Sequence, residues 1–249
     1  SSLERVYKSL CDQSLKDFEW LIVDDGSNDG TEDLVSLWVQ EKKLTINYYY
    51  QTNMGKPSAL NKGIQLARGK LFACLDSDDE IVPHALNRLW MAWEAVEDKS
   101  FVKTITCMCK SESGEILRNP KIEDLSIFSP IDMFFFQPGE RWGCHELSSL
   151  KKFSFPIFSG EKFIPESVVW LQLAEIYHAI WVNEALRIYH NSKESLSSIS
   201  NSLKYSNPNG YLIHYATLLK VSPTLRLKTI SLLKLIFHIL VRLILRSKL

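Results

Sequence analysis

The sequence predicts an α/β fold whose central sheet is mainly parallel. Three times within residues 1–100, a short apolar run ends in a polar loop that leads into a pattern of helical spacing. The apolar runs lie at 18–23, 44–50 and 70–75. Because right-handed crossovers between parallel strands place all strand-to-helix loops at one edge of the sheet, we expect these polar loops to converge there.

The residues around each loop are typical of turns and helix starts. The first run ends in a turn at 24–27, and the next helix is expected to start at Thr31. Pro57 and Pro83 follow the second and third loops, where the first turn of a helix accepts proline. Beyond residue 100 the alternation weakens, and we expect strands at 101–109, 140–147, 179–182 and 186–190 and a helix at 168–177.

Composition narrows the class of protein. Lys and Arg total 29, as do Asp and Glu, so the formal net charge is zero and no broad basic field is expected to attract nucleic acid. The five cysteines are an odd number and contain no CxxC pair, which argues against a disulfide framework or a zinc site. A reducing, cytoplasmic location fits this pattern best.

An acidic cluster follows the third apolar run. Asp76, Asp78 and Asp79 fall within four positions, where their repulsion is costly unless a cation or solvent offsets it. Mg²⁺ or Mn²⁺ takes one or two protein carboxylates and completes its coordination with phosphate and water, so such a site suits a diphosphate ligand. The alternative is a solvated acidic turn that caps the helix after Pro83.

The other two loops carry residues suited to the same ligand. Asp24 and Asp25 can accept hydrogen bonds from a base and a ribose. Asn53 and Lys56 flank a glycine ahead of a helix N-terminus, a combination that suits an anion, although Lys56 could also be an exposed loop lysine. Each loop alone is a weak signal, and it is their placement after consecutive strands that predicts a nucleotide-diphosphate site.

Three segments resemble the family 2 glycosyltransferases: VDDGSNDGT at 23–31, NMGKPSALNKGI at 53–64 and LDSDDE at 75–80. The resemblance is strong over about 3–100 and looser to about 190. It implies a GT-A fold, a three-layer sandwich, and a nucleotide-sugar donor, most often a UDP-sugar. It further implies a hexosyl- or N-acetylhexosaminyl-transferase that acts in surface polysaccharide or glycolipid synthesis.

The resemblance also assigns roles to the loop residues. It implies that Asp24 and Asp25 contact the uracil and ribose of the donor. The Asp-X-Asp element places Asp76 near the ribose and the metal, Asp78 on the Mg²⁺ or Mn²⁺, and Asp79 close to the sugar or diphosphate.

Transfer with inversion in a single displacement requires a base for the acceptor hydroxyl. The family often has Glu-Asp at this position with the aspartate as base, whereas this sequence reads Pro165-Glu166-Ser167. Glu166 is therefore the candidate base, and the alternative is a carboxylate that stabilises the start of the following helix. Trp142, His145 and Trp170 either shape an acceptor pocket or pack in the core.

Family members usually begin with a β-strand and a Pro-Thr-Tyr-Asn-like loop, whereas this sequence opens on a helical pattern. We therefore expect an N-terminally shortened member of the family. This departure keeps open an alternative function, a catalytically inactive sugar-nucleotide or glycan-binding module. A nucleotidyltransferase is a further alternative, but it normally needs a Gly-rich, basic triphosphate loop that is not visible here.

The sequence divides into three predicted parts. Residues 1–100 form the nucleotide-sugar-binding half of the catalytic domain, 101–200 the half that binds a glycan or lipid-linked acceptor, and 201–249 a tail. In the tail, 225–249 is predicted to be an amphipathic helix rich in Leu and Ile with one narrow polar stripe. Its charges favour contact with an anionic membrane surface, at the cytoplasmic face, over a membrane span. The alternative is a helix that docks on a partner or on its own domain.

Overall fold

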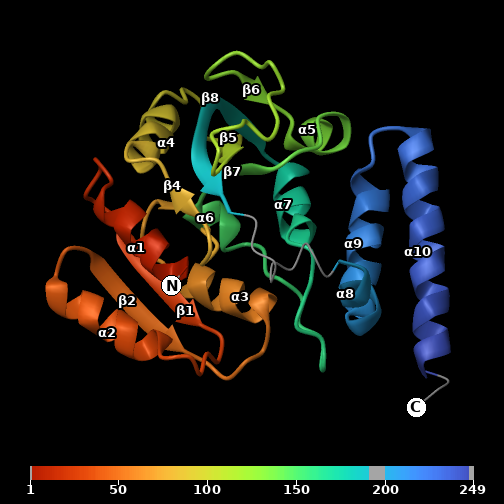
Figure 1. Cartoon of the computed structure of the whole chain (residues 1–249). Helices are drawn as coiled ribbons and strands as arrows, with labels where there is room; N and C mark the ends of the chain where they lie inside the picture. Colours follow the sequence, from red (N-terminus) through yellow and green to blue (C-terminus); the bar gives the residue numbers. More distant parts are fainter. Residues whose placement is uncertain (1, 191–199, 247–249) are drawn as a thin grey trace.

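A computed structural model describes residues 2–190 and 200–246 of the chain (Figure 1). The predicted order of strands and helices is present in the first part of the chain. Its elements are α1 (Ser2–Cys11), β1 (Glu19–Asp24), α2 (Thr31–Glu41), β2 (Thr45–Tyr50) and α3 (Lys56–Leu66). Pro57 lies in the first turn of α3, as its fixed φ angle predicts.

The strands form two separate sheets. β1 and β2 pair in parallel, with Glu19 opposite Thr45 and Asp24 opposite Tyr50. The second sheet has the order β3-β7-β5-β8-β4, and β6 pairs with β8 outside this path. Its strands are β3 (Leu71–Phe72), β4 (Glu80–Ile81), β5 (Val102–Ser111), β6 (Ile127–Phe128), β7 (Arg141–Glu146) and β8 (His178–Tyr189).

The expectation of one mainly parallel sheet is wrong, because the strands form two sheets and most of the described strand pairs are antiparallel. Only β1 with β2 and β5 with β8 are parallel, and the other strand pairs described are antiparallel. The predicted strand at 70–75 is reduced to Leu71–Phe72, which pairs with β7 rather than with β1. The long strands of the second sheet come from the part of the chain where helices and strands cease to alternate, and antiparallel neighbours need no helical crossover.

The main core lies between the second sheet and the helices α1 and α4 (Ala85–Glu94). Val6 of α1 and Trp93 of α4 pack in the same buried cluster as Ile105, Cys107 and Cys109 of β5. Cys107 and Cys109 are free, buried thiols on one face of the strand, as their spacing predicts. Because β3 and β4 pair with β7 and β8, the parts 1–100 and 101–200 share one sheet.

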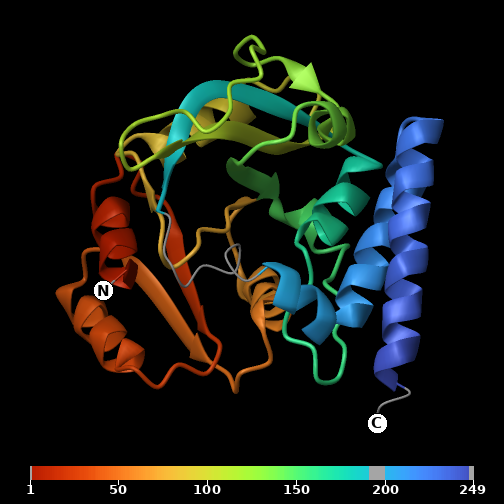
Figure 2. The same ribbon diagram turned by 45° about the vertical axis from the view of Figure 1, so that its right-hand side comes forward.

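The last two helices, α9 and α10, form a hairpin on one side of the domain, and α10 is outermost in both views (Figures 1 and 2). The remaining helices are α5 (Pro130–Phe136), α6 (Leu147–Leu150), α7 (Ser167–Ala174), α8 (Ser200–Ser206), α9 (Pro208–Val221) and α10 (Leu225–Arg246). The predicted tail helix is thus confirmed over Leu225–Arg246, while 247–249 lie outside the described residues. None of the described helices is both long enough and apolar enough to span a bilayer.

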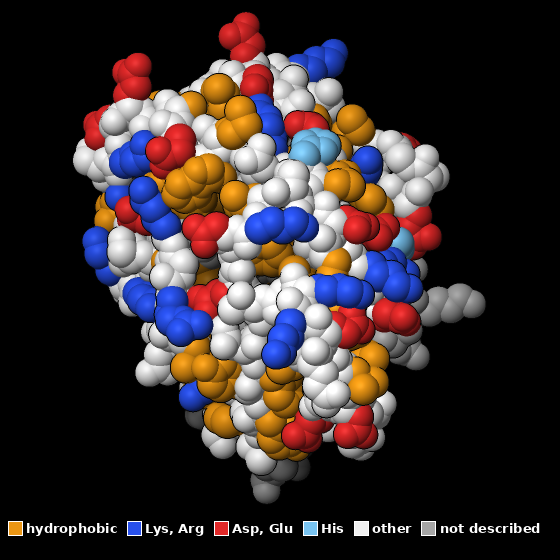
Figure 3. Space-filling model, turned by 90° about the vertical axis from the view of Figure 1, so that its left-hand side faces the viewer, with side chains coloured by type: hydrophobic (Ala, Val, Ile, Leu, Met, Phe, Trp, Pro, Cys, Tyr) orange, Lys and Arg blue, Asp and Glu red, His pale blue; other side chains and the backbone are white. Residues whose placement is uncertain are grey.

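On the opposite side of the domain from this hairpin, acidic and basic side chains are interspersed among apolar ones (Figure 3). Among the side chains drawn there for the described residues, neither sign forms a field that covers the face.

Gly143 provides a test of the sheet. A Cβ at this position of β7 would lie 1.9 Å from the carbonyl oxygen of Ile105 on β5. We expect Gly143→Ala to lower the free energy of unfolding by about 1–3 kcal/mol or more, because backbone rather than a flexible side chain must move. The matched control is Gly114→Ala, where φ is +85° but no atom lies within 4 Å, and about 1 kcal/mol is expected. Equal losses in denaturant unfolding would contradict the close approach of β5 and β7.

Candidate active site

The three predicted loops are joined in a chain of side-chain contacts. The Asp25 carboxylate in the first loop accepts hydrogen bonds from the backbone N–H groups of Met54 (2.9 Å) and Gly55 (2.7 Å) in the second loop. Lys56, at the end of the second loop, donates to Asp76 in the third at 2.6 Å. The loops after the predicted strands therefore converge, although the strands belong to two sheets.

Asp24 is used inside the first loop. It is 5% exposed, and its carboxylate accepts hydrogen bonds from the Tyr48 hydroxyl (2.6 Å) and the Ser27 backbone N–H (2.7 Å). Burial would raise the pKa of Asp24, but these hydrogen bonds outweigh it and lower that pKa. Gly26 at φ +86° brings the first loop against Asn53, since a Cβ there would lie 2.7 Å from the Asn53 nitrogen. Asp24 therefore shapes the first loop, against which the exposed Asn53 of the second loop lies, and the donor contacts of both residues stay a prediction.

Asp25 organises the second loop. Besides the two backbone groups, it accepts a hydrogen bond from the Gln51 side chain at 2.8 Å. The backbone of Gly55 has φ +91°, and a Cβ there would lie 2.1 Å from the carbonyl oxygen of Lys162, so no larger residue fits without movement. A ligand role for Asp25 also stays a prediction.

Lys56 occupies the centre of the site. Its ammonium lies 2.6 Å from Asp76 Oδ1 and 2.6 Å from Glu166 Oε1. Burial alone would lower the pKa of Lys56, but the charges of Glu166 and Asp76 outweigh it and raise that pKa. Burial likewise opposes the effect of Lys56 on the pKa of Asp76, which is lowered overall. The alternative that Lys56 is an exposed loop lysine is wrong.

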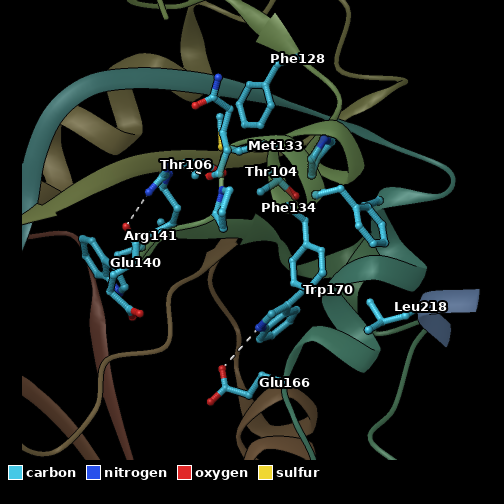
Figure 4. A pocket seen from close by; sticks show the side chains of 18 of the residues that line it. Thr104, Thr106, Phe128, Met133, Phe134, Glu140, Arg141, Glu166, Trp170 and Leu218 are labelled. Atoms are coloured by element: carbon cyan, nitrogen blue, oxygen red, sulfur yellow. Dashed lines mark hydrogen bonds between the residues drawn. The ribbon is translucent and has the colours of Figure 1, made fainter. Parts of the chain in front are cut away.

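Glu166 stands immediately before α7 and points into the site (Figure 4). One carboxylate oxygen contacts Lys56, and the other accepts a hydrogen bond of 3.3 Å from the Trp170 indole N–H. The two contacts fix the direction of the carboxylate. Glu166 therefore lies in reach of the same cavity as Asp76, as a base acting beside a diphosphate must.

Arg187 of β8 belongs to the site, although no motif in the sequence predicted it. Its side chain is 7% exposed and lies 2.6 Å from Asp79, 3.3 Å from Glu140 and 3.8 Å from Asp76. Burial would lower the pKa of Arg187, but the surrounding acidic groups outweigh it. A lone arginine in the otherwise apolar run Ala185–Tyr189 was the available signal, because a cation within a buried strand needs an acidic partner.

Asp79 is buried against this arginine. Its side chain is 1% exposed, and its second oxygen accepts a hydrogen bond from the His190 backbone N–H at 3.1 Å. Burial raises the pKa of Asp79 although Arg187 acts in the opposite direction. Of the three aspartates, Asp79 thus has the least access to a ligand, and its expected contact with the sugar or diphosphate stays a prediction.

The acidic loop fits a cation that takes most of its ligands from a substrate. Within residues 2–190 and 200–246, no three His, Cys, Asp or Glu side chains are grouped closely enough to hold a metal ion by themselves. Asp76 contacts Lys56, and Asp78 is half-buried in the same turn. One or two carboxylates are what Mg²⁺ or Mn²⁺ takes from the protein when a diphosphate supplies further oxygens.

A cavity of about 830 Å³ adjoins Asp76, Glu166 and Arg187 (Figure 4). Trp142, His145 and Trp170 line it as well. Trp142 is also a buried core residue, and the His145 ring stacks on Trp170 with 4.6 Å between ring centroids. These aromatic residues therefore both pack and line the cavity, and their role in an acceptor pocket stays a prediction.

An α/β domain whose strand-end loops gather acidic groups and a cation beside a cavity is typical of proteins that bind a nucleotide diphosphate. Residues 1–155 match the family Glycosyl transferase family 2, and the chain belongs to that family. An uncharacterized glycosyltransferase of Methanocaldococcus jannaschii is 30% identical over 136 residues, which cover 54% of this chain and 46% of the relative. TuaG of Bacillus subtilis, provisionally named as a teichuronic acid biosynthesis glycosyltransferase, is 37% identical over 78 residues, or 31% of each protein. The chain thus spans less than half the length of these relatives.

Solved structures support the fold. Crystal structures of Staphylococcus aureus TarS 1-349 in complex with UDP and with UDP-GlcNAc superpose with TM-scores of 0.68 and 0.71. The sequence identities are 16% and 15%, and the matches cover 95% of this chain and 66% and 67% of the TarS chains. The predicted GT-A fold is thereby confirmed.

Because the imidazole of His145 is buried, we expect the free energy of unfolding to depend on pH. Burial lowers the pKa of His145 to about 4, so the unfolded state takes up a proton near pH 6.5 that the folded state resists. This contribution to stability is complete above pH 6.5 and is lost as the pH falls toward 4. We expect the free energy of unfolding to fall by about 1–2 kcal/mol more between pH 7 and 5 in the wild type than in His145→Gln. Parallel curves of stability against pH would contradict it.

Proposed function

We propose that this chain is an inverting glycosyltransferase that moves a sugar from a nucleotide diphosphate, a UDP-sugar, to an acceptor hydroxyl. The observation that carries the proposal is the position of Lys56 between Asp76 and Glu166. One cation thereby links a carboxylate of the expected diphosphate site to the candidate base, and both carboxylates line the same cavity. A single displacement requires the leaving group and the proton acceptor to be held close to one reacting carbon, and this proximity supports the proposal.

The reaction proceeds by attack of the acceptor oxygen on the anomeric carbon. As that bond forms, the bond from the anomeric carbon to the diphosphate oxygen breaks, and its electron pair leaves with the nucleoside diphosphate. The acceptor proton passes to the Glu166 carboxylate. Lys56 binds oxygens of the diphosphate, so its pairing with Glu166 weakens when the donor is present and the base becomes available.

Asp78, with Asp76, would hold Mg²⁺ or Mn²⁺ when the donor is bound. The ion supplies neutralisation of the charge that grows on the departing diphosphate. Asp24, Asp25 and Asn53 shape the loops that receive the base and ribose. The UDP and UDP-GlcNAc complexes of TarS support a UDP-sugar donor and a hexosyl or N-acetylhexosaminyl group.

A role in surface polysaccharide or glycolipid synthesis is supported by the name of the B. subtilis relative. All five cysteines are free thiols, which suits a reducing compartment and a cytoplasmic location. Contact of 225–249 with the inner face of a membrane would bring the site to a glycan or lipid-linked acceptor. The alternative, a catalytically inactive sugar-nucleotide or glycan-binding module, predicts donor binding without turnover.

Glu166→Gln tests the base. We expect transfer from a UDP-sugar to fall by about 10²–10⁴-fold, because the amide cannot take the acceptor proton, while the KM for the donor changes little. The matched control is Glu175→Gln at the end of α7, where the carboxylate pairs with Lys220 away from the cavity. The initial rate of UDP release measures transfer by the wild type and by each variant. Full activity of Glu166→Gln rejects the base, and donor binding by a wild type that shows no turnover supports the inactive module.

Asp78→Asn tests the metal site. We expect chelation to abolish transfer by the wild type and added Mn²⁺ or Mg²⁺ to restore it. The variant is expected to need about tenfold or more metal for half-maximal rate, since one anionic ligand is lost. Asp17→Asn, at an exposed position outside the site, is the control. A rate that is insensitive to chelator would show that the diphosphate is neutralised by Lys56 and other protein groups alone.

A further inference from the structure

The cavity extends well beyond the candidate catalytic groups. It begins beside Asp76 and Glu166, and it reaches Leu227, Ile230 and Lys234 on α10. Its walls come from β5, β7, α5, α7, α9 and α10. A single hollow therefore connects the site of chemistry with the outermost helix of the molecule.

Charged groups lie at both ends of this hollow. Asp76, Glu140, Glu166 and Arg187 lie at the catalytic end. Lys234 lies at the α10 end, where Leu218, Leu227 and Ile230 supply apolar lining. In Figure 4, Trp170 lies next to Glu166. The apolar residues that line the hollow include Phe128, Met133, Phe134, Phe135, Ala174 and Leu218.

The aromatic rings nearest Glu166 are poorly placed to bind a sugar by stacking. His145 stacks on Trp170 at an interplanar angle of 17°, and Phe155 meets the same indole edge-on. Trp142 is buried and donates its indole N–H to the carbonyl of Cys74 at 2.7 Å. Rings with their faces and polar groups already engaged favour an apolar occupant over an extended glycan.

Helix α10 turns its polar side inward. Ser231 and His238 are 4% and 3% exposed, and the His238 ring stacks on Tyr211 and Tyr215 of α9. The outward positions are large and apolar, with Leu233 61% and Phe237 53% exposed. A helix that buries serine and histidine while it exposes leucine and phenylalanine is the reverse of a helix at an ordinary protein surface.

The charges on α10 favour an anionic partner for this outward face. Leu225–Arg246 contains five Lys and Arg residues and neither Asp nor Glu, and Arg226 and Lys228 are exposed. A helix that exposes apolar side chains and carries only positive charge is complementary to an anionic lipid surface. Ile230 is 40% exposed and also lines the hollow, so the apolar path opens next to the face that would meet the lipid.

We propose that the hollow binds a lipid-borne acceptor, whose apolar chain enters beside Ile230 from an anionic bilayer and places the acceptor hydroxyl at Glu166. The inference rests on the proposed glycosyltransferase function and names the acceptor class. The hydroxyl oxygen of the lipid-borne headgroup forms the new bond to the anomeric carbon, the diphosphate leaves, and Glu166 takes the proton. The hairpin of α9 and α10 forms the entrance.

The test uses phosphatidylcholine–phosphatidylglycerol vesicles that contain a long-chain alkyl phosphate with a photoreactive diazirine in mid-chain. After irradiation, cross-linked peptides are mapped by mass spectrometry. We expect labels on the peptides of Phe134, Trp170 and Leu218 in the wild type, and at least tenfold less labelling there in Ile230→Asp. Thr229→Asp is the matched control, because it adds the same charge at the adjacent exposed position, which does not line the hollow.

Flotation with the same vesicles measures how much each variant binds, and a difference in labelling per bound protein reports the hollow. Phe134→Asp, which changes another residue that lines the hollow, supplies a second measurement if the melting temperature shows that Ile230→Asp is unfolded. Labels confined to the outward face of α10, or equal labelling of the two α10 variants, would overturn the acceptor path. Hydrolysis of a UDP-sugar by the wild type without any acceptor tests the proposed glycosyltransferase function separately. Hydrolysis without labelling of the hollow would reject the acceptor path alone, whereas absence of hydrolysis would count against the proposed function.

Discussion

The ammonium of Lys56 lies between two carboxylates that come from distant parts of the chain, and the site depends on this contact. Lys56 begins α3, Asp76 follows β3, and Glu166 precedes α7. Each charge loses hydration as it is buried, and the two pairings offset that loss. Without the lysine, Asp76 and Glu166 would repel each other beside the cavity. A diphosphate that attracts the same ammonium therefore competes with Glu166, which couples donor binding to the state of the base.

Arg187 acts in the same way on the other side of Asp76. It pairs with Asp79 and Glu140, so two cations offset part of the charge of the four carboxylates that they contact before any ligand binds. Burial raises the pKa of Glu140, which lines the cavity, and Arg187 opposes that shift. This partial offset helps to explain how three aspartates in one short turn are tolerated in the folded protein. The carboxylates outnumber the two cations, so the turn keeps negative charge that a divalent cation can offset.

Convergence of the three loops could be predicted because each step is local: an apolar run, a turn and a helix start, repeated in order. The contact of Lys56 with Glu166 and the position of Arg187 could not, since both depend on pairing between segments far apart in the sequence. The division into two sheets was hidden for the same reason, because residues 70–75 do not show which strand they pair with. Asp24 and Asp25 illustrate the limit at single residues, since their carboxylates are engaged by Tyr48, Gln51 and backbone groups that sequence spacing does not reveal.

The hairpin of α9 and α10 connects the candidate active site to the outer surface of the molecule. Tyr211, Tyr215 and Leu218 of α9 pack on Leu171 of α7, so the hairpin is fixed to the helix that Glu166 precedes. Because α10 meets α9 partly through Ser231 and His238, little apolar area of α10 is buried inside the molecule. Burial of its outward face in lipid would recover about 25 cal/mol for each Å² removed from water. Insertion would therefore hold α10 at the bilayer without a spanning segment, and α9 and α7 would set the distance of Glu166 from the lipid.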